Sequence, residues 1–555
     1  MRSTMQQGSL LISDILNYAS RMYGSTGEVV TWTADGPRRI SYAELARRTA
    51  QLANALRSKL GVTSDQRVAT FMWNNSEHVE AYFGVPSMGA VLHQLNIRLF
   101  PEQLVYVANH AEDQVVIVDN SLAPAFAELL PEMSTVRHVV VNGPVPPEVR
   151  EALDASGREV HDYEQLIGDQ PDSYDWPQFD ENQAAAMCYT SGTTGEPKGV
   201  VYSHRSIYLH SLQMGLASTL GIGPRDRVLP VVPMFHANAW GLVHGALAMG
   251  ASLVLPDRFL QSEPLAEMIE QERVTTGGGV PTIWAGLLNH LDTHEVDTSS
   301  VRALLVGGSA CPPALMRAYE ERHGIHVLHA YGMTETSPLV SVAVPPPGVV
   351  GEEASRYRAT QGRLAVGVQA RIVAADGSSQ PWDGNAQGEL EFAGPWITGS
   401  YYRATPEEMA EKFDDGWLRT GDIGTVTPDG YVTITDRAKD VIKSGGEWIS
   451  SVDLENTLAG HPSVLEATVI GVPDEKWGER PLAVVVLRDG HAVTPEDLRE
   501  FLSSEFARWQ LPERWAFVEE VPKTSVGKFD KKAMRAQYAE GQIWVQTVEV
   551  TAAQS

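Results

Sequence analysis

Apolar positions recur every three or four residues between residues 41 and 60, in the segment SYAELARRTAQLANALRSKL. This spacing places them on one face of a helix and predicts an amphipathic α-helix. Ser41 and Glu44, at its start, have the spacing of a capping box. The apolar residues that share the face are Leu45, Leu52, Ala53, Leu56 and Leu60.

Short apolar runs rich in β-branched residues alternate with helical stretches in the first part of the chain. This alternation is typical of layered α/β structure with buried sheets. We therefore expect an α/β fold there. The predicted strands lie at 67–73, 114–119, 138–143, 227–232, 251–256 and 303–308.

The pattern changes twice further along the chain. The Pro, Gly and charge density of 343–360 predicts a surface loop. From about residue 361 the strand-like pieces are shorter and end in Gly or Asp, which indicates a β-rich, barrel-like subdomain over about 361–436. The pattern after 436 is that of a separate, small α+β domain. We thus expect a large domain over 1–436 and a small C-terminal domain, with no internal repeat.

The composition narrows the classes of protein. A chain of 555 residues with 43% hydrophobic content should form two or more globular domains. Its formal net charge of -27 argues against a nucleic-acid partner, because phosphate backbones are bound by clustered Lys and Arg. Cys188 and Cys311 offer no disulfide framework and fit a reducing cytosol. No apolar run approaches the roughly 18 residues of a membrane span, and Ser13 and Asp14 interrupt the first apolar patch. We expect a cytoplasmic protein without a transmembrane segment.

The stretch YTSGTTGEPKG, residues 189–199, has the composition of a phosphate-binding loop. Its glycines permit close backbone approach, its hydroxyls and amides can donate to phosphate oxygens, and Lys198 adds a positive charge. The positions of Gly192 and Gly195 relative to Lys198 do not match a Walker P-loop or a kinase glycine loop. The residues alone leave two interpretations open, a triphosphate-binding loop and a flexible surface turn.

This loop resembles the phosphate-loop signature of the adenylate-forming superfamily, which includes acyl-CoA synthetases, luciferases and the adenylation domains of peptide synthetases. Four further superfamily motifs follow in the expected order, so the resemblance spans nearly the whole chain. It implies ATP, Mg2+ and CoA as ligands and a mobile C-terminal domain. The four motifs are YGMTET at 331–336, RTGD at 419–422, DRAKDVIKSGGEWIS at 436–450 and PKTSVGK at 522–528.

The resemblance assigns a nucleotide site. Thr190 and Glu335 would hold Mg2+, which prefers oxygen ligands. Asp422 would accept hydrogen bonds from the ribose hydroxyls. Taken alone, the two carboxylates could equally be a solvated side chain and a turn residue. The residues assigned to ATP or AMP binding are Thr190, Ser191, Gly192, Thr193, Thr194, Gly195, Lys198, Gly308, His329, Ala330, Tyr331, Gly332, Thr334, Asp422, Arg437, Lys439 and Lys443.

The C-terminal motifs imply the catalytic and mobile parts. Lys528 would bridge the substrate carboxylate and the α-phosphate, which opposes the repulsion between two anions; as plain sequence it belongs to a solvated basic cluster. Residues 437–440, with Lys439, would form a hinge to a mobile domain over 441–555. Without the resemblance, the Gly-Gly pair beyond the hinge would simply be a turn. The expected pantetheine channel consists of Gly445, Gly446 and Trp448.

The segment VVPMFHANAWG, residues 231–241, indicates which class of acid the protein would bind. It could be buried core at a strand end, but it resembles medium- and long-chain fatty-acyl-CoA synthetases. That resemblance places His236, as a catalytic residue, beside the reacting carboxylate, and makes Trp240 a gate across an apolar acyl tunnel. An apolar tunnel suits alkyl chains, since each buried CH2 contributes about 0.8 kcal/mol.

Three functions remain in view. The favoured one is an ATP-dependent fatty acid:CoA ligase that forms acyl-AMP and then acyl-CoA. The second is an adenylating enzyme for an aryl or other acid, or one that uses a separate carrier protein. The third is a non-catalytic nucleotide- or lipid-binding protein on the same fold. The expected partners are small molecules, and the resemblance also allows a homodimer and transient contact with a membrane surface.

Overall fold

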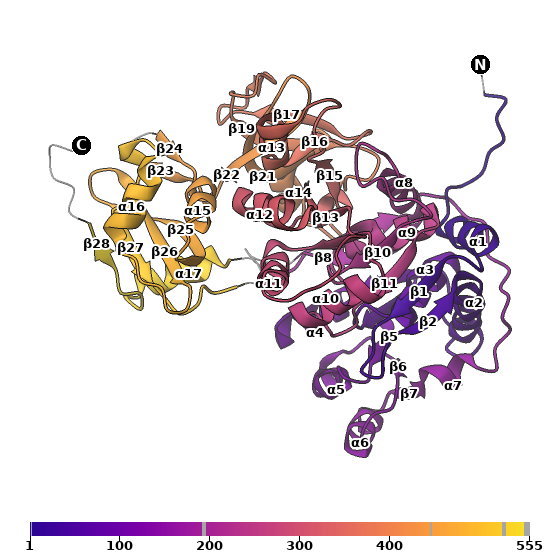
Figure 1. Ribbon diagram of the computed structural model, residues 1–555. Helices are drawn as coiled ribbons and strands as arrows, with labels where there is room; N and C mark the ends of the chain where they lie inside the picture. The colour runs from indigo at the N-terminus through magenta and orange to yellow at the C-terminus, as the bar shows by residue number, and fades with distance from the viewer. Residues whose placement is uncertain (2, 191–195, 445–446, 524–528, 549–555) are drawn as a thin grey trace.

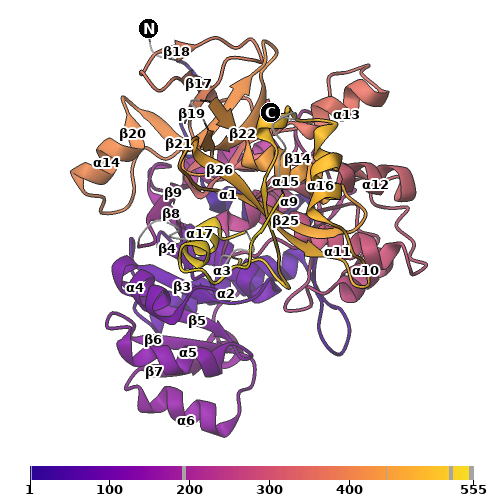
Figure 2. The ribbon, with the colours of Figure 1, turned by 90° about the vertical axis from the view of Figure 1, so that its left-hand side faces the viewer.

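The computed structural model describes residues 1, 3–190, 196–444, 447–523 and 529–548, with the backbone alone at 447 and 448. It consists of a large α/β domain and a smaller C-terminal domain, the yellow part of Figure 1. The view in Figure 2 looks onto the C-terminal domain in front of the large one. No helix of the described residues is long and apolar enough to cross a membrane.

A seven-stranded sheet forms one layer of the large domain. Its strands are parallel from β7 to β8, and β9 pairs antiparallel with β8. The predicted phosphate loop thus connects β8 to β9. In sheet order the strands are β7 (Glu159–Asp162), β6 (His138–Asn142), β5 (Asp113–Asp119), β3 (Arg67–Phe71), β4 (Val91–Gln94), β8 (Ala184–Tyr189) and β9 (Gly199–Ser203).

A fifteen-stranded sheet forms the second layer and has two halves. The half from β14 to β1 is parallel, with β2 (Arg38–Ser41) antiparallel at its edge. Strand β14 (His326–Gly332) pairs parallel with β13 on one side and antiparallel with β15 on the other. The strands of the parallel half after β14 are β13 (Ala303–Val306), β12 (Thr276–Gly279), β10 (Arg227–Pro230), β11 (Ser252–Leu255) and β1 (Glu28–Thr31).

The antiparallel half continues the same sheet beyond β14. Strand β20 (Phe413–Asp414) pairs with β21 off the main path. In sheet order the other strands are β15 (Leu339–Val342), β16 (Gly362–Leu364), β22 (Tyr431–Arg437), β21 (Trp417–Val426), β19 (Gly388–Ala393), β17 (Gln369–Val373) and β18 (Ser379–Gln380).

Helices bury the faces of these sheets. The largest hydrophobic core is formed by helices α1, α2, α3, α8 and α9 and by residues of the two sheets. The helices of the large domain are α1 (Ile12–Met22), α2 (Tyr42–Ser58), α3 (Ser76–Ser87), α4 (Pro101–Ala111), α5 (Ala123–Leu129), α6 (Pro147–Ala155), α7 (Tyr163–Ile167), α8 (His204–Met214), α9 (Leu242–Met249), α10 (Ser262–Gln271), α11 (Pro281–Leu291), α12 (Pro313–His323), α13 (Gly351–Ala359) and α14 (Pro406–Lys412).

The C-terminal domain has a six-stranded sheet with its own helices and its own cores. Strand β25 (Val464–Asp474) pairs off the main path with β26. In sheet order the remaining strands are β24 (Glu447–Ile449), β23 (Ile442–Ser444), β26 (Gly478–Leu487), β27 (Arg514–Phe517) and β28 (Gln546–Thr547). The helices are α15 (Ser451–Ala459), α16 (Pro495–Ser503) and α17 (Lys531–Ala539).

The predicted amphipathic helix and all six predicted strands of the large domain are present. The helix is α2, and Ser41 Oγ accepts the Glu44 backbone N–H at 3.2 Å at its start. The fold class expected from the sequence, a large α/β domain followed by a small α+β domain, is confirmed.

Two details of the predicted fold are wrong. The segment 343–360 is not entirely loop, because it contains helix α13, whose first turn is acidic and whose last turn is basic. These charges favour a helix through its dipole, and the Pro and Gly residues before it concealed the signal. The β-rich segment 361–436 forms no closed barrel within the described residues; its strands extend the fifteen-stranded sheet.

Candidate active site

A cavity of about 480 Å³ lies where the phosphate-loop strands, β14 and the end of β22 meet. It brings together residues from four of the five sequence motifs and from the segment 231–241. The predicted site residues that line it are Thr190, Lys198, His236, Trp240, Gly308, Ala330, Tyr331, Gly332, Thr334, Glu335, Arg437 and Lys439.

The motif YGMTET occupies the point where the large sheet changes from parallel to antiparallel. The register between β14 and β15 shifts between Tyr331 and Gly332. A Cβ on Gly332 would lie 1.9 Å from the Pro338 carbonyl oxygen, so this position requires glycine. The shift ends strand β14 and directs the following residues, Thr334 and Glu335, toward the cavity that they line.

Glu335 is buried, with 6% of its surface exposed, and the Tyr401 hydroxyl donates to its Oε1 at 2.6 Å. Among the described residues only Tyr401 hydrogen-bonds this carboxylate, so Oε2 remains able to bind a cation. Thr190 lines the same cavity, and its Oγ1 accepts the Lys198 backbone N–H at 3.1 Å. Oxygen ligands from a hydroxyl and a carboxylate fit Mg2+. Burial raises the pKa of Tyr401, so its hydroxyl stays a donor.

A three-residue network connects β14 to the end of β22. Tyr331 donates to Asp422 Oδ2 at 2.5 Å, and Arg437 Nε lies 3.1 Å from Asp422 Oδ1. The Asp422 charge raises the pKa of Arg437, and burial raises that of Tyr331. Both carboxylate oxygens therefore already have partners. Asp422 is buried and does not line the cavity, whereas Tyr331 and Arg437 do.

Lys198, the positively charged residue of the phosphate-loop motif, forms a salt bridge with helix α14. Lys198 Nζ lies 3.0 Å from Glu408 Oε1 and 5.3 Å from the centre of the Tyr401 ring. The Thr405 backbone N–H and Lys198 together lower the pKa of Glu408, so its carboxylate is ionised. Both charged side chains are about one-third exposed. A triphosphate that reaches Lys198 must therefore compete with Glu408 for this ammonium group.

The cavity also has apolar lining residues, among them Trp240, Met214 and Leu220. Trp240 is buried and packs against a glycine pair, since a Cβ on Gly307 or Gly308 would lie 3.4 or 3.6 Å from its indole ring. His236 lines the cavity together with them. Residues 237–240 form a turn of left-handed backbone, with φ between 44° and 55°.

Three predicted nucleotide ligands do not line the cavity: Asp422, His329 and Lys443. His329 is buried next to Ala330 on β14, and burial lowers its pKa to about 4, so the ring is neutral. Lys443 is exposed on β23 in the C-terminal domain. Lys439 does line the cavity, and burial lowers the pKa of its ammonium group.

Several predicted site residues lie outside the described part of the chain. Trp448 belongs to β24, but its side chain is not described. The others are Ser191, Gly192, Thr193, Thr194, Gly195, Gly445, Gly446 and Lys528.

Sequence reasoning missed Tyr401, Glu408 and Glu411, which also line the cavity. Glu408 carried only a local signal, because with Thr405 it forms a capping box at the start of α14. Nothing in the spacing of Tyr401 connects it with Glu335, since the pair is brought together by long-range folding.

The two-domain fold and this cavity define a protein with the fold of the adenylate-forming ligases. The chain belongs to the AMP-binding enzyme family: the model of the AMP-binding enzyme matches residues 21–402, and that of the AMP-binding enzyme C-terminal domain matches residues 453–528.

The sequence is similar to those of named CoA ligases over nearly its full length. The chain is 42% identical to the 3-methylmercaptopropionyl-CoA ligase of Ruegeria lacuscaerulensis, over 97% of this chain and 99% of the relative. It is 45% identical to the long-chain-fatty-acid–CoA ligase of Thermus thermophilus, over 97% of each chain. Among solved structures it resembles the anthranilate CoA ligase AuaEII in complex with anthranoyl-AMP, with a TM-score of 0.87, 25% identity, and coverage of 98% of this chain and 100% of the other.

Proposed function

We propose that this protein is an ATP-dependent acid:CoA ligase that activates a medium- or long-chain fatty acid. The carboxylate attacks the α-phosphate of ATP to give acyl-AMP and pyrophosphate, and the CoA thiol then attacks the acyl carbon and releases AMP. The observation that carries the proposal is that one cavity is lined both by the phosphate-loop residues Thr190 and Lys198 and by His236 and Trp240. Nucleotide and acid could meet there.

The first step needs positive charge between two anions. Lys198 would exchange Glu408 for the phosphates, and Arg437 would stay beside the ribose through its contact with Asp422. Thr190 and Glu335 would hold Mg2+, which when bound neutralises phosphate charge. Lys528 would guide the carboxylate to the α-phosphate; it lies outside the described residues.

The acid would lie with its carboxylate beside His236 and its chain against the apolar lining residues Met214, Leu220 and Trp240. Two classes of acid are supported. Alkyl acids fit the apolar lining and the name of the Thermus thermophilus relative. A short thioether acid is the second candidate, because the Ruegeria relative is named for 3-methylmercaptopropionyl-CoA.

The second step requires the C-terminal domain to change its orientation relative to the large domain. We propose that residues 437–440 act as the hinge around Lys439, and that residues 441–555 rotate so that Gly445, Gly446 and Trp448 line a pantetheine channel. Lys443 would then approach the nucleotide. A carrier protein in place of CoA, and an aryl acid in place of a fatty acid, remain the alternatives for the acceptor and the substrate.

Location and assembly complete the proposal. The two cysteines are buried and unpaired, which supports a cytoplasmic enzyme in a reducing compartment. A homodimer and a transient membrane contact during lipid uptake belong to the same proposal. Sedimentation with and without vesicles would test both.

A pyrophosphate-release screen tests the function. Purified protein is given ATP, Mg2+ and alkanoic acids of increasing length, 3-methylmercaptopropionate and aryl acids, each with and without CoA. We expect acid-dependent release with an optimum among alkanoic acids, and AMP and acyl-CoA as products only when CoA is present. His236→Ala should lower the rate at least tenfold, while His290→Ala, on helix α11, should not. An optimum among aryl acids would overturn the substrate proposal, and no release with any acid would overturn the function.

A further inference from the structure

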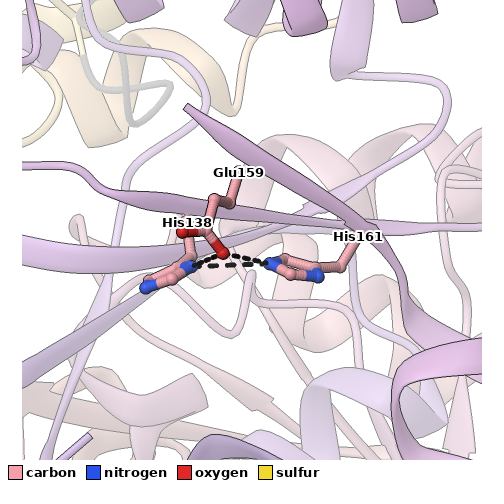
Figure 3. A group of neighbouring side chains, drawn as sticks. All are labelled: His138, Glu159 and His161. Atoms are coloured by element: carbon pink, nitrogen blue, oxygen red, sulfur yellow. Dashed lines mark hydrogen bonds and ion pairs between the residues drawn. The ribbon is translucent and has the colours of Figure 1, made fainter. Parts of the chain in front are cut away.

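Two neighbouring strands at the edge of the seven-stranded sheet carry three potential metal ligands. Strand β7 is the outermost strand and pairs in parallel with β6, with His138 opposite Glu159. His161 follows Glu159 by two residues on the same strand, so the two side chains point to the same face of the sheet. Figure 3 shows the two imidazole rings and the carboxylate converging on one point.

The separations of the three ligand atoms fit a transition-metal ion. His161 Nε2 lies 3.4 Å from His138 Nδ1, and Glu159 Oε2 lies 3.5 Å from His138 Nδ1 and 3.9 Å from His161 Nε2. The point in the plane of these three atoms that is equally distant from them lies about 2.1 Å from each, which is the Zn–N and Zn–O bond length. In a tetrahedral site with such bonds the ligand atoms lie roughly 3.4 Å apart. Two of the three separations match this value, and a small movement of the exposed Glu159 side chain would shorten the third.

The chemistry of the three groups suits a borderline cation. Each neutral imidazole can carry its proton on the ring nitrogen away from the group, Nε2 in His138 and Nδ1 in His161, so the facing nitrogens can both donate a lone pair. Two imidazoles and one carboxylate are a ligand set of zinc sites, whereas Mg2+ prefers oxygen atoms alone. The guanidinium of Arg150 is engaged elsewhere, with Asp154 at 3.1 Å and with the Val160 carbonyl oxygen at 3.1 Å.

The exposure of the group leaves a ligand position for water. The Glu159 side chain is 70% exposed, and those of His138 and His161 are 14% and 24% exposed. An ion can therefore enter from solvent and keep a water molecule as its fourth ligand.

The group is distant from the candidate active site. Strands β7 and β8 are five positions apart in the sheet, which is about 24 Å at about 4.8 Å per strand. Both ribbon views place β6, β7 and α6 at the end of the molecule away from α14 (Figures 1 and 2). An ion here would not take part in acyl transfer; it would fasten the edge strand β7 to β6 and close the intervening segment that contains α6.

We propose that His138, Glu159 and His161 form a binding site for a divalent cation of the zinc type that stabilises the edge of the seven-stranded sheet. This site is separate from the Mg2+ ligands of the nucleotide site and does not depend on the proposed ligase function.

Titration calorimetry with Zn2+ on the full-length, nucleotide-free protein tests the proposal. We expect one binding event per chain that is weakened at least tenfold in His138→Ala, in His161→Ala and in Glu159→Gln. The last substitution preserves side-chain shape at an exposed position, so it should not disturb folding. Zn2+ should also raise the melting temperature of the wild type but not that of His138→Ala/His161→Ala.

The chain offers a matched control. His290, which is half-buried, and His294, which is exposed, form a stacked pair elsewhere in the molecule, with ring centres 4.0 Å apart. The double variant His290→Ala/His294→Ala removes as many histidines and should keep the binding event. Equal Zn2+ affinity in the wild type and in His138→Ala/His161→Ala, or loss of binding in the control alone, would overturn the site.

Discussion

His244 lies in the core of the large domain, on helix α9, with 2% of its surface exposed. Its ring packs against Tyr82 and Phe83, at centroid distances of 5.2 and 5.1 Å. Neither ring nitrogen has a hydrogen-bond partner among the described residues. Burial first, and then the charge of His210, lower its pKa to about 3. His244 therefore packs as a neutral aromatic ring, and its two buried nitrogens without hydrogen bonds lower the stability of the fold.

Replacing His244 by Phe should stabilise the protein, and more at pH 5 than at pH 8. The folded pKa of about 3 lies below the unfolded value of about 6.5, so below pH 6.5 the unfolded chain binds a proton that the folded chain does not. The wild type thus loses stability as the pH falls through this range, and the variant lacks this loss. The expected extra gain at pH 5 is about 2 kcal/mol in the free energy of unfolding, measured with urea.

His294→Phe is the control, because it replaces an exposed histidine by the same residue type. An equal effect of His244→Phe at the two pH values would mean that His244 is not buried as a neutral ring.

At the same scale, the sequence predicted the residues that belong to local motifs. Tyr331, Thr334 and Glu335 were found because the cavity uses a continuous stretch of chain. Tyr401 and Glu408 could not be found, because their importance arises from contacts with Glu335 and Lys198, which are distant in sequence. The motifs therefore identified Glu335 and Lys198, but not the residues that contact them.

The turn Ala237–Gly241 departs from regular helical structure. Its residues from Ala237 to Trp240 have φ between 44° and 55°, and Gly241 has φ 75°. Left-handed backbone costs about 1–2 kcal/mol per non-glycine residue, so packing must hold this turn. Asn238 contributes, since its Oδ1 accepts from Gln94 at 2.6 Å in the core. The turn orients Trp240 toward the glycine pair at 307 and 308.

Gly241→Ala should destabilise the large domain by about 3 kcal/mol, because overpacking and left-handed strain add at this position. A Cβ there would lie 2.3 Å from His210 Cε1, on a backbone that disfavours side chains. Urea unfolding measures the loss, and the rate with long acids should fall as Trp240 shifts. Gly223→Ala is the matched control, because a Cβ there meets nothing within 4 Å. Equal stability of the two variants would show that the turn tolerates a side chain.

Periodicity predicted elements well where one face is buried. It located α2 and the central strands because their apolar residues repeat at the helical or strand period. It failed at α13, where Ala354 is the buried residue and the remaining helical signal comes from charge. It could not reveal the left-handed turn at all, since tertiary contacts determine that backbone.

Over the whole molecule, the hydrophobic cores divide between the two domains. The core clusters of the C-terminal domain contain residues from Ile442 onward, while those of the large domain end at Ile434. The sequence predicted a separate C-terminal domain, because its pattern of apolar and polar residues changes after residue 436. It could not predict that one sheet runs from β2 to β18 through both halves of the large domain, because strand pairing over such separations leaves no local pattern.

Calorimetry should resolve two unfolding transitions, because the described cores are not shared between the domains. Leu458 and Leu304 are both fully buried, in the C-terminal and in the large domain. Each change to Ala should remove about 2–5 kcal/mol from its own domain. Leu458→Ala should therefore lower one transition temperature and Leu304→Ala the other. If both variants lowered a single common transition, the domains would unfold as one unit, and a C-terminal domain able to rotate about residues 437–440 would lose its physical basis.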